Sequence, residues 1–158
     1  MDLRIIYAIL LSILPISELR GGLIYASLNN LNPITSFLAC TIANILVIFF
    51  VFFFLDNIHH LFLRDRIYKK FFDGYVKIIQ GKVDKFEKKY SAIGFLALAL
   101  FVAIPLPATG AWSGVLISWL LDLDRKKSIL AIASGVLIAG ILVLLGTLGV
   151  LGLFNVLN

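Results

Sequence analysis

The chain has 158 residues, of which 61% are hydrophobic and 15% charged, whereas soluble domains are roughly half apolar and a quarter charged. This composition excludes an ordinary soluble domain, and the long apolar runs indicate an integral membrane protein. The net charge of +5 does not indicate nucleic-acid binding, because most basic residues stand in one segment between apolar runs. We expect membrane lipids and no nucleic acid as partners.

The first apolar stretch, 3–28, is interrupted by Pro15. The two arms on either side are each too short to cross a hydrocarbon core of about 30 Å as a helix, and proline removes a backbone donor at the break. Turn residues occupy 29–33. The uncharged run 35–55 that follows is long enough to span. Residues 1–56 are therefore predicted to form a first unit, a hairpin followed by a span.

Residues 57–90 differ in kind, because most of the chain's Lys and Arg residues fall here. Apolar residues from Phe72 to Tyr90 recur every three or four positions, which predicts one stripe of an amphipathic helix. We expect this basic linker to lie on an anionic, cytoplasmic membrane surface. A short coiled-coil seam against a partner subunit is the alternative.

The second half, 91–158, repeats the plan of the first. A broken apolar stretch, 91–121, contains two prolines near its middle, and a polar turn follows at 122–127. The run 128–153 is again long enough to span. This half is therefore predicted to be a second hairpin followed by a second span.

The two breaks correspond at an offset of 92 positions, because Pro15 then falls on Pro107 and Gly22 on Gly114. Each broken stretch could be one kinked span, which makes the halves parallel repeats. It could instead be a re-entrant hairpin, which makes the second half inverted relative to the first. The positive-inside rule favours hairpins, because the basic linker and Arg125–Lys127 then share the cytoplasmic side.

The predicted fold is therefore an all-α integral membrane protein of the multi-pass type in the cell membrane. It is an inverted repeat of a re-entrant helical hairpin plus a transmembrane helix, joined by a basic amphipathic linker. Two spans and two hairpins enclose little volume, so we expect a homo-oligomer, a homodimer or larger.

Glu18 and Arg20 are the pair most in need of a functional explanation. A charge near the bilayer centre costs about 2.5–3.5 kcal/mol on insertion scales. The Arg20 guanidinium offers a fork of donors that matches phosphate or carboxylate, and Glu18 is a candidate for proton coupling. The alternative is an internal ion pair that fixes the hairpin tip.

The residues around both breaks complete a candidate anion site. Helix arms that begin after the prolines present free N–H groups and a positive dipole end, and glycines allow close approach. Trp112 could bracket an apolar tail, although packing is the commoner role of such a residue. The candidate substrate-binding residues are Pro15, Glu18, Arg20, Gly21, Gly22, Pro107, Thr109, Gly110, Trp112, Ser113 and Gly114.

Enzymatic chemistry is poorly supported. No nucleophile–base pair, phosphate loop or metal-ligand spacing is present, so we expect no catalytic residue, cofactor or metal. His59 and His60 are interpreted as part of a solvated face, and Asn44 as an interhelical hydrogen bond. Cys40 is the only cysteine, so no internal disulfide can form.

The strings from Pro15 to Gly22 and from Pro105 to Gly114 resemble those of the small multidrug export family of prokaryotic membrane proteins. That family is similar, more distantly, to DedA-type (VTT-like) proteins with paired re-entrant hairpins, which are implicated in moving lipid phosphates with proton or ion coupling. The resemblance implies that Glu18 and Arg20 match the acid and arginine of the first hairpin. The second hairpin departs from the DedA pattern because it carries no charge.

The leading hypothesis is a transporter of an anionic amphipathic substrate, such as a polyprenyl phosphate or another lipid phosphate. Arg20 and the hairpin backbone would bind the head group, and Glu18 would couple to protons or another ion. One alternative is an exporter of small amphipathic compounds with Glu18 as a cation site. Another is a non-transporting membrane assembly protein that acts through its basic linker.

Overall fold

The computed structural model describes residues 3–62, 65–74, 76–77, 95–106 and 109–157. These residues form helices and the turns between them, and none of them belongs to a strand. The prediction of an all-helical protein is confirmed, as is that of two long apolar helices.

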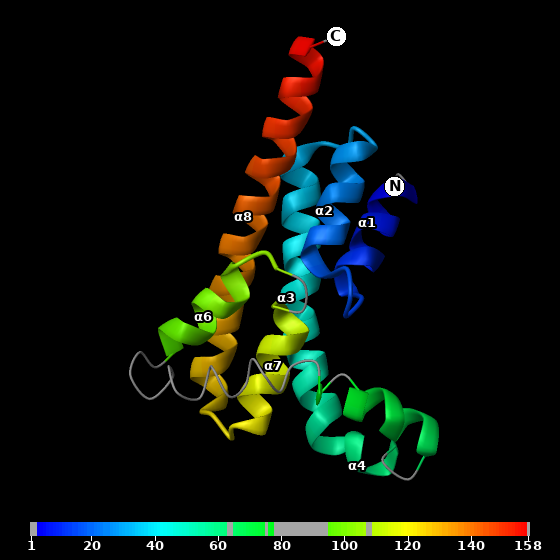
Figure 1. Ribbon diagram of the computed structural model, residues 1–158, viewed down its shortest axis with the longest axis vertical. Helices are drawn as coiled ribbons and strands as arrows, with labels where there is room; N and C mark the ends of the chain where they lie inside the picture. Colours follow the sequence, from blue (N-terminus) through cyan, green and yellow to red (C-terminus); the bar gives the residue numbers. More distant parts are fainter. Residues whose placement is uncertain (1–2, 63–64, 75, 78–94, 107–108, 158) are drawn as a thin grey trace.

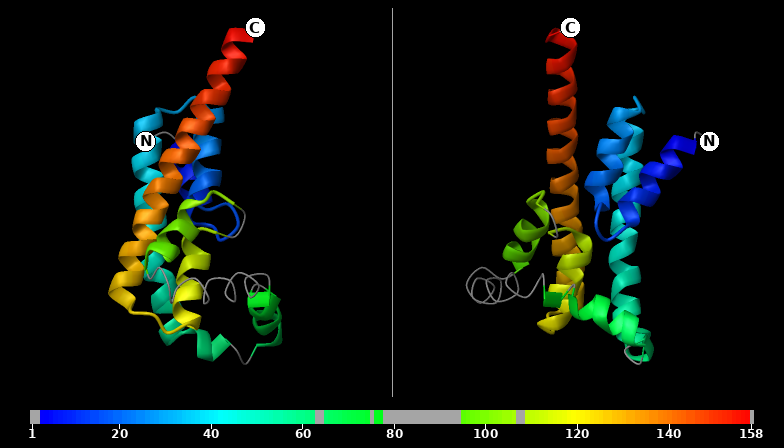
Figure 2. Two further views of the ribbon diagram at one scale, coloured as in Figure 1. Left: turned by 60° about the vertical axis from the view of Figure 1, so that its left-hand side comes forward. Right: turned by 45° about the vertical axis from the view of Figure 1, so that its right-hand side comes forward.

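The two long helices are α3 (Pro33–Asn57) and α8 (Arg125–Leu157), which contact one another and run in opposite directions (Figures 1 and 2). Each contains a stretch long and apolar enough to cross a membrane. Both extend beyond the predicted runs 35–55 and 128–153 at each end. The predicted runs were ended where polar residues begin. In the structure, helical hydrogen bonding continues through these polar residues.

The first short pair consists of α1 (Leu3–Ile13) and α2 (Glu18–Leu28), which double back on one another beside α3 (Figure 1). The chain leaves the helix around Pro15, because proline cannot donate to the preceding turn. The arms pack closely because Gly22 has no side chain: a Cβ there would lie 2.5 Å from the carbonyl oxygen of Ala8. This pair is a helical hairpin, here called hairpin 1.

A buried amide attaches hairpin 1 to α3. The Asn44 side chain donates to the carbonyl oxygen of Ser12 at 2.7 Å, and Asn44 is 1% exposed. Ser12 lies near the end of α1, where carbonyls lack helical partners. The interhelical hydrogen bond predicted for Asn44 is therefore present.

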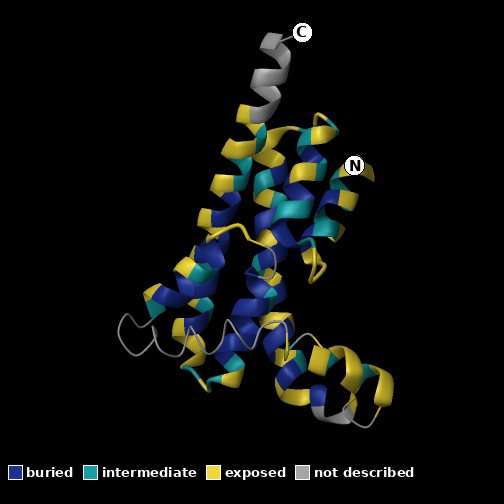
Figure 3. Ribbon diagram, in the orientation of Figure 1, coloured by how far each residue is buried: buried dark blue, intermediate teal, exposed yellow. Residues whose placement is uncertain are grey.

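The second short pair, α6 (Phe95–Ala103) and α7 (Ala111–Leu120), forms hairpin 2. Hairpin 1 points from one end of the bundle toward its middle, and hairpin 2 points from the other end, so that their tips meet near mid-height (Figure 1). Burial is concentrated where the hairpins contact the long helices (Figure 3).

Helix boundaries recur at a constant offset in the two halves. The ends of α2 and α7 and the starts of α3 and α8 are each 92 positions apart. The hydrogen bonds that end α2 recur at the end of α7, where Leu31 N–H to Ala26 O corresponds to Leu123 N–H to Ser118 O. This bond is typical of a Schellman motif.

The described part of the linker comprises α4 (His59–Phe62) and helical residues 66–74 and 76–77, at the end of the bundle where α3 finishes (Figure 1). The predicted stripe from Phe72 onward continues into 78–94, which lies outside the described residues. Burial raises the pKa of the Tyr68 hydroxyl.

The interpretation of His59 as part of a solvated face is wrong. His59 is 3% exposed, its ring contacts Phe72 and Trp119, and its Nδ1 lies 2.8 Å from the Tyr68 hydroxyl. The helical segment after α4 folds back over the ring and removes it from solvent.

Candidate functional site at the hairpin tips

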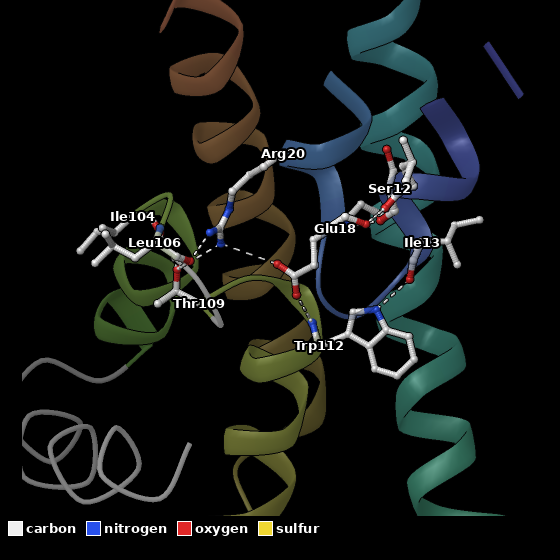
Figure 4. Close-up of polar contacts among 11 residues, drawn as sticks. Ser12, Ile13, Glu18, Arg20, Ile104, Leu106, Thr109 and Trp112 are labelled. Carbon is white, nitrogen blue, oxygen red and sulfur yellow. Dashed lines mark hydrogen bonds and ion pairs between the residues drawn. The ribbon is translucent and has the colours of Figure 1, made fainter. Parts of the chain in front are cut away.

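Glu18 is the first residue of α2 and adopts a left-handed backbone conformation, with φ of 48°. This backbone conformation costs a non-glycine residue about 1–2 kcal/mol of conformational free energy. The conformation turns the chain after Pro15 and directs the Glu18 side chain toward hairpin 2 (Figure 4). The side chain crosses to hairpin 2 and is buried, with Glu18 4% exposed.

The Glu18 carboxylate occupies the N-terminal end of α7. Its Oε1 accepts a hydrogen bond from the backbone N–H of Trp112 at 3.3 Å. A Cβ at Gly110 would lie 1.4 Å from its Oε2, so that this approach requires glycine. The first N–H groups of a helix and its dipole favour a negative charge. Glu18 therefore lies where an anion would bind.

Arg20 carries the charge opposite to that of Glu18, and its side chain also reaches hairpin 2. Its Nη2 lies 3.6 Å from Glu18 Oε2 and donates to the Thr109 hydroxyl at 3.1 Å. Its Nη1 donates to the carbonyl oxygen of Leu106. The arginine thus contacts an acid, a hydroxyl and a backbone carbonyl from both hairpins (Figure 4).

Thr109 organises the loop that Arg20 contacts. Its hydroxyl oxygen lies 2.6 Å from the Ile104 carbonyl oxygen and 2.7 Å from that of Leu106. The Leu106 N–H donates to the same hydroxyl at 3.2 Å. Thr109 is 5% exposed, whereas the Ile104 and Leu106 residues that it contacts are about half exposed, so Thr109 fixes a loop that lies at the surface.

Trp112 connects the two tips in the opposite direction, from hairpin 2 to hairpin 1. Its indole N–H donates to the carbonyl oxygen of Ile13 at 2.9 Å, and Ile13 is the last residue of α1. Arg20 of hairpin 1 therefore reaches the loop of hairpin 2, while Trp112, 92 positions later, reaches the end of the first arm of hairpin 1. Two reciprocal contacts join the tips.

The remaining predicted residues are divided between the tips and the packing inside each hairpin. Pro15 is exposed at the tip of hairpin 1, and Ser113 is buried in α7. Pro107 lies outside the described residues. Gly21 and Gly22 face hairpin 1 itself, and Gly114 faces Val102 of α6.

The interpretation of Glu18 and Arg20 as an internal pair describes only part of the geometry. The pair exists, but each member also bonds to hairpin 2, so the pair joins two tips. Sequence analysis missed the carbonyls of Leu106 and Ile13, because backbone acceptors leave no side-chain signal. The prolines on either side of Leu106 were the nearest indication of an irregular loop.

Two antiparallel apolar helices long enough to span, with two opposed hairpins joined at their tips by a partly buried ion pair, indicate an all-helical membrane protein. The chain belongs to a family described as "Putative small multi-drug export protein", whose model matches residues 18–142. That match begins at Glu18, just after the turn of hairpin 1, and it includes hairpin 2 and the first part of α8. Searches of curated proteins and of solved structures found no significant match.

Proposed function

We propose that the protein is a membrane transporter of an anionic amphipathic substrate, such as a polyprenyl phosphate or another lipid phosphate. The observation that carries the proposal is the Glu18 carboxylate at the N-terminal end of α7, beside Arg20. A site that holds one carboxylate in this way has the donors that a phosphate needs. Glu18 acts as an internal occupant that the substrate displaces.

An inverted repeat gives this site a route to alternating access. Three observations support the repeat: the constant offset of helix boundaries, the recurring bonds at the ends of α2 and α7, and the opposed directions of the hairpins (Figure 1). Contacts between halves are also reciprocal, because α2 packs on α8 and α7 packs on α3. The hairpins are re-entrant in a bilayer and open the site from one side at a time.

Glu18 couples the site to protons. A protonated Glu18 carries no charge, so it competes less well with a phosphate for Arg20 and for the N-terminal end of α7. Protonation therefore favours substrate entry, and deprotonation favours release. Translocation is expected to accelerate as the pH falls in the wild type and to lose this dependence in Glu18→Gln.

The test is translocation of a fluorescent polyprenyl phosphate in proteoliposomes. Arg20→Ala is expected to lower the initial rate about tenfold or more, because a charge-assisted contact to phosphate is lost. Arg125→Ala is the matched control: it breaks an ion pair with Asp56 outside the tips and should leave the rate within about twofold of the wild type. Undiminished transport in both Arg20→Ala and Glu18→Gln contradicts the proposal.

The family description, which names small multi-drug export, favours a second candidate: export of small amphipathic or cationic compounds, with Glu18 as the cation site. A buried carboxylate is the expected partner of such a cation. In this case Glu18→Gln abolishes transport of a cationic dye and Arg20→Ala does not. The lipid-phosphate proposal predicts greater sensitivity at Arg20.

We also propose that the transporting unit is a homodimer, because two spans and two hairpins enclose little volume. Many large apolar side chains of α3 and α8 are exposed in the single chain, which leaves area for a partner copy. Subunit counting in nanodiscs tests this directly, and a functional monomer contradicts it.

A further inference from the structure

An apolar groove of about 1040 Å³ lies between the tip of hairpin 1 and the linker. It begins at Pro15 and Ile16, passes along Phe50 and Phe54 of α3, and is closed on one side by Trp112 of α7. Ligand pockets usually measure about 300–1,000 Å³, so this groove has room for an extended molecule. Two of its lining residues, Pro15 and Trp112, are also candidate substrate-binding residues.

The groove is apolar at one end and basic at the other. Ile16 at its inner end is 94% exposed, and Phe71 in the linker is 77% exposed. Arg66 and Lys70, four positions apart on one helical segment, line its outer end, and no carboxylate is among the described residues that line it. Such a polarity matches a single amphiphile with an apolar chain and an anionic head.

The position of the groove favours a lipid as the occupant. It follows α3, one of the two candidate spans, and its basic end lies where that helix finishes. In a bilayer, this places the apolar part beside the lipid chains and the two cations at head-group level. The inner end reaches Trp112, whose backbone N–H binds Glu18.

We infer that this groove binds one anionic membrane lipid, with its chain along α3 and its phosphate at Arg66 and Lys70. The site differs from that at Arg20, because neither Arg20 nor Glu18 lines the groove. It holds a lipid from the leaflet on the linker side within reach of the hairpin tips. The inference requires that the chain lies in a bilayer, as in the proposed function, and does not require translocation.

The two tryptophans provide a matched pair of reporters. Trp112 lines the groove, whereas Trp119 lies outside it, with its indole bound to Asp56. The full-length Trp119→Phe variant is reconstituted in vesicles with chain-brominated phosphatidylglycerol or, at the same mole fraction, chain-brominated phosphatidylcholine. We expect brominated phosphatidylglycerol to quench the fluorescence of Trp112 roughly twofold or more better than brominated phosphatidylcholine does. The Trp112→Phe variant, which reports on Trp119, should show no such preference.

The preference at Trp112 should disappear when Arg66→Gln and Lys70→Gln are added. It should persist with Lys69→Gln and Lys77→Gln, which remove the same charge from residues that do not line the groove. Equal quenching by both lipids, the same preference at Trp119, or equal loss in both double variants overturns the inference. Absence of quenching by either lipid also overturns it, because a polypeptide then covers the groove. None of these results bears on the proposed function, which is tested separately by the effect of Arg20→Ala on the transport rate.

Discussion

At the residue scale, the contact between the tips depends on Gly110, a position where a side chain is not allowed. The Glu18 carboxylate reaches α7 only because Gly110 has no Cβ, which would lie 1.4 Å from Oε2. Glu18 itself adopts a left-handed backbone conformation, which is unfavourable for residues other than glycine. Strain of this kind persists where surrounding contacts over-determine it, and here those contacts are Trp112 and Arg20.

Gly110→Ala is therefore expected to displace the carboxylate and to lower the free energy of unfolding by about 1–3 kcal/mol, as overpacking does. Equilibrium unfolding in mixed detergent micelles measures this. Gly146→Ala is the control, because nothing lies within 4 Å of a Cβ there, and it should not lower stability, since alanine is favoured over glycine inside a helix by about 0.5–1 kcal/mol. An unchanged stability in Gly110→Ala would contradict the described contact.

Residue patterns predicted much of this site, but not its internal geometry. Pro15 indicated a break and the paired glycines indicated close approach, because each acts on the local backbone. The left-handed turn at Glu18 and the Leu106 and Ile13 acceptors depend on how two distant hairpins meet. The solvated position predicted for His59 was wrong because its burial also depends on a tertiary contact, with a later segment that folds back over the ring.

At the element scale, the two halves begin their long helices in the same way. The Asn32 side chain accepts a bond from the N–H of Thr35 at the start of α3. The Asp124 side chain accepts one from the N–H of Lys127 at the start of α8. Both caps and both recipients are 92 positions apart. The long runs were predictable because composition alone identifies spans, whereas the equivalence of these caps required the three-dimensional contacts.

Asn32→Ala and Asp124→Ala should each cost about 1 kcal/mol of stability, the usual effect of losing an N-cap. Chemical unfolding of the two variants beside Lys126→Ala measures the effect. Lys126 is an exposed residue in the same turn, so its substitution should change stability by no more than about 0.5 kcal/mol. A cost at only one cap would show that the two ends are not energetically equivalent.

At the scale of the whole molecule, the opposed hairpins predict which segments share a side of the bilayer. The described part of the linker and the turn before α8 lie at one end of the bundle, and the turn between α2 and α3 lies at the other (Figure 1). Because basic segments are retained inside, the first end is expected to face the cytoplasm.

Cysteine labelling with a membrane-impermeant maleimide in intact cells tests this topology. Cys40 is buried and is replaced by alanine in the background. Ile34→Cys should react in intact cells, while Lys70→Cys and Lys126→Cys should react only after permeabilisation. Labelling of Lys70→Cys and Lys126→Cys from opposite sides would instead indicate two kinked spans.

The central claim is that Glu18 occupies a site built for an anionic substrate, and a binding titration tests it most directly. Farnesyl phosphate is titrated calorimetrically into the detergent-solubilised protein. The account predicts that Glu18→Gln binds about tenfold more tightly, because the internal competitor is gone. It predicts that Arg20→Ala binds about tenfold more weakly and that Arg125→Ala is unchanged. Equal affinity in the wild type, Glu18→Gln and Arg20→Ala would contradict the claim.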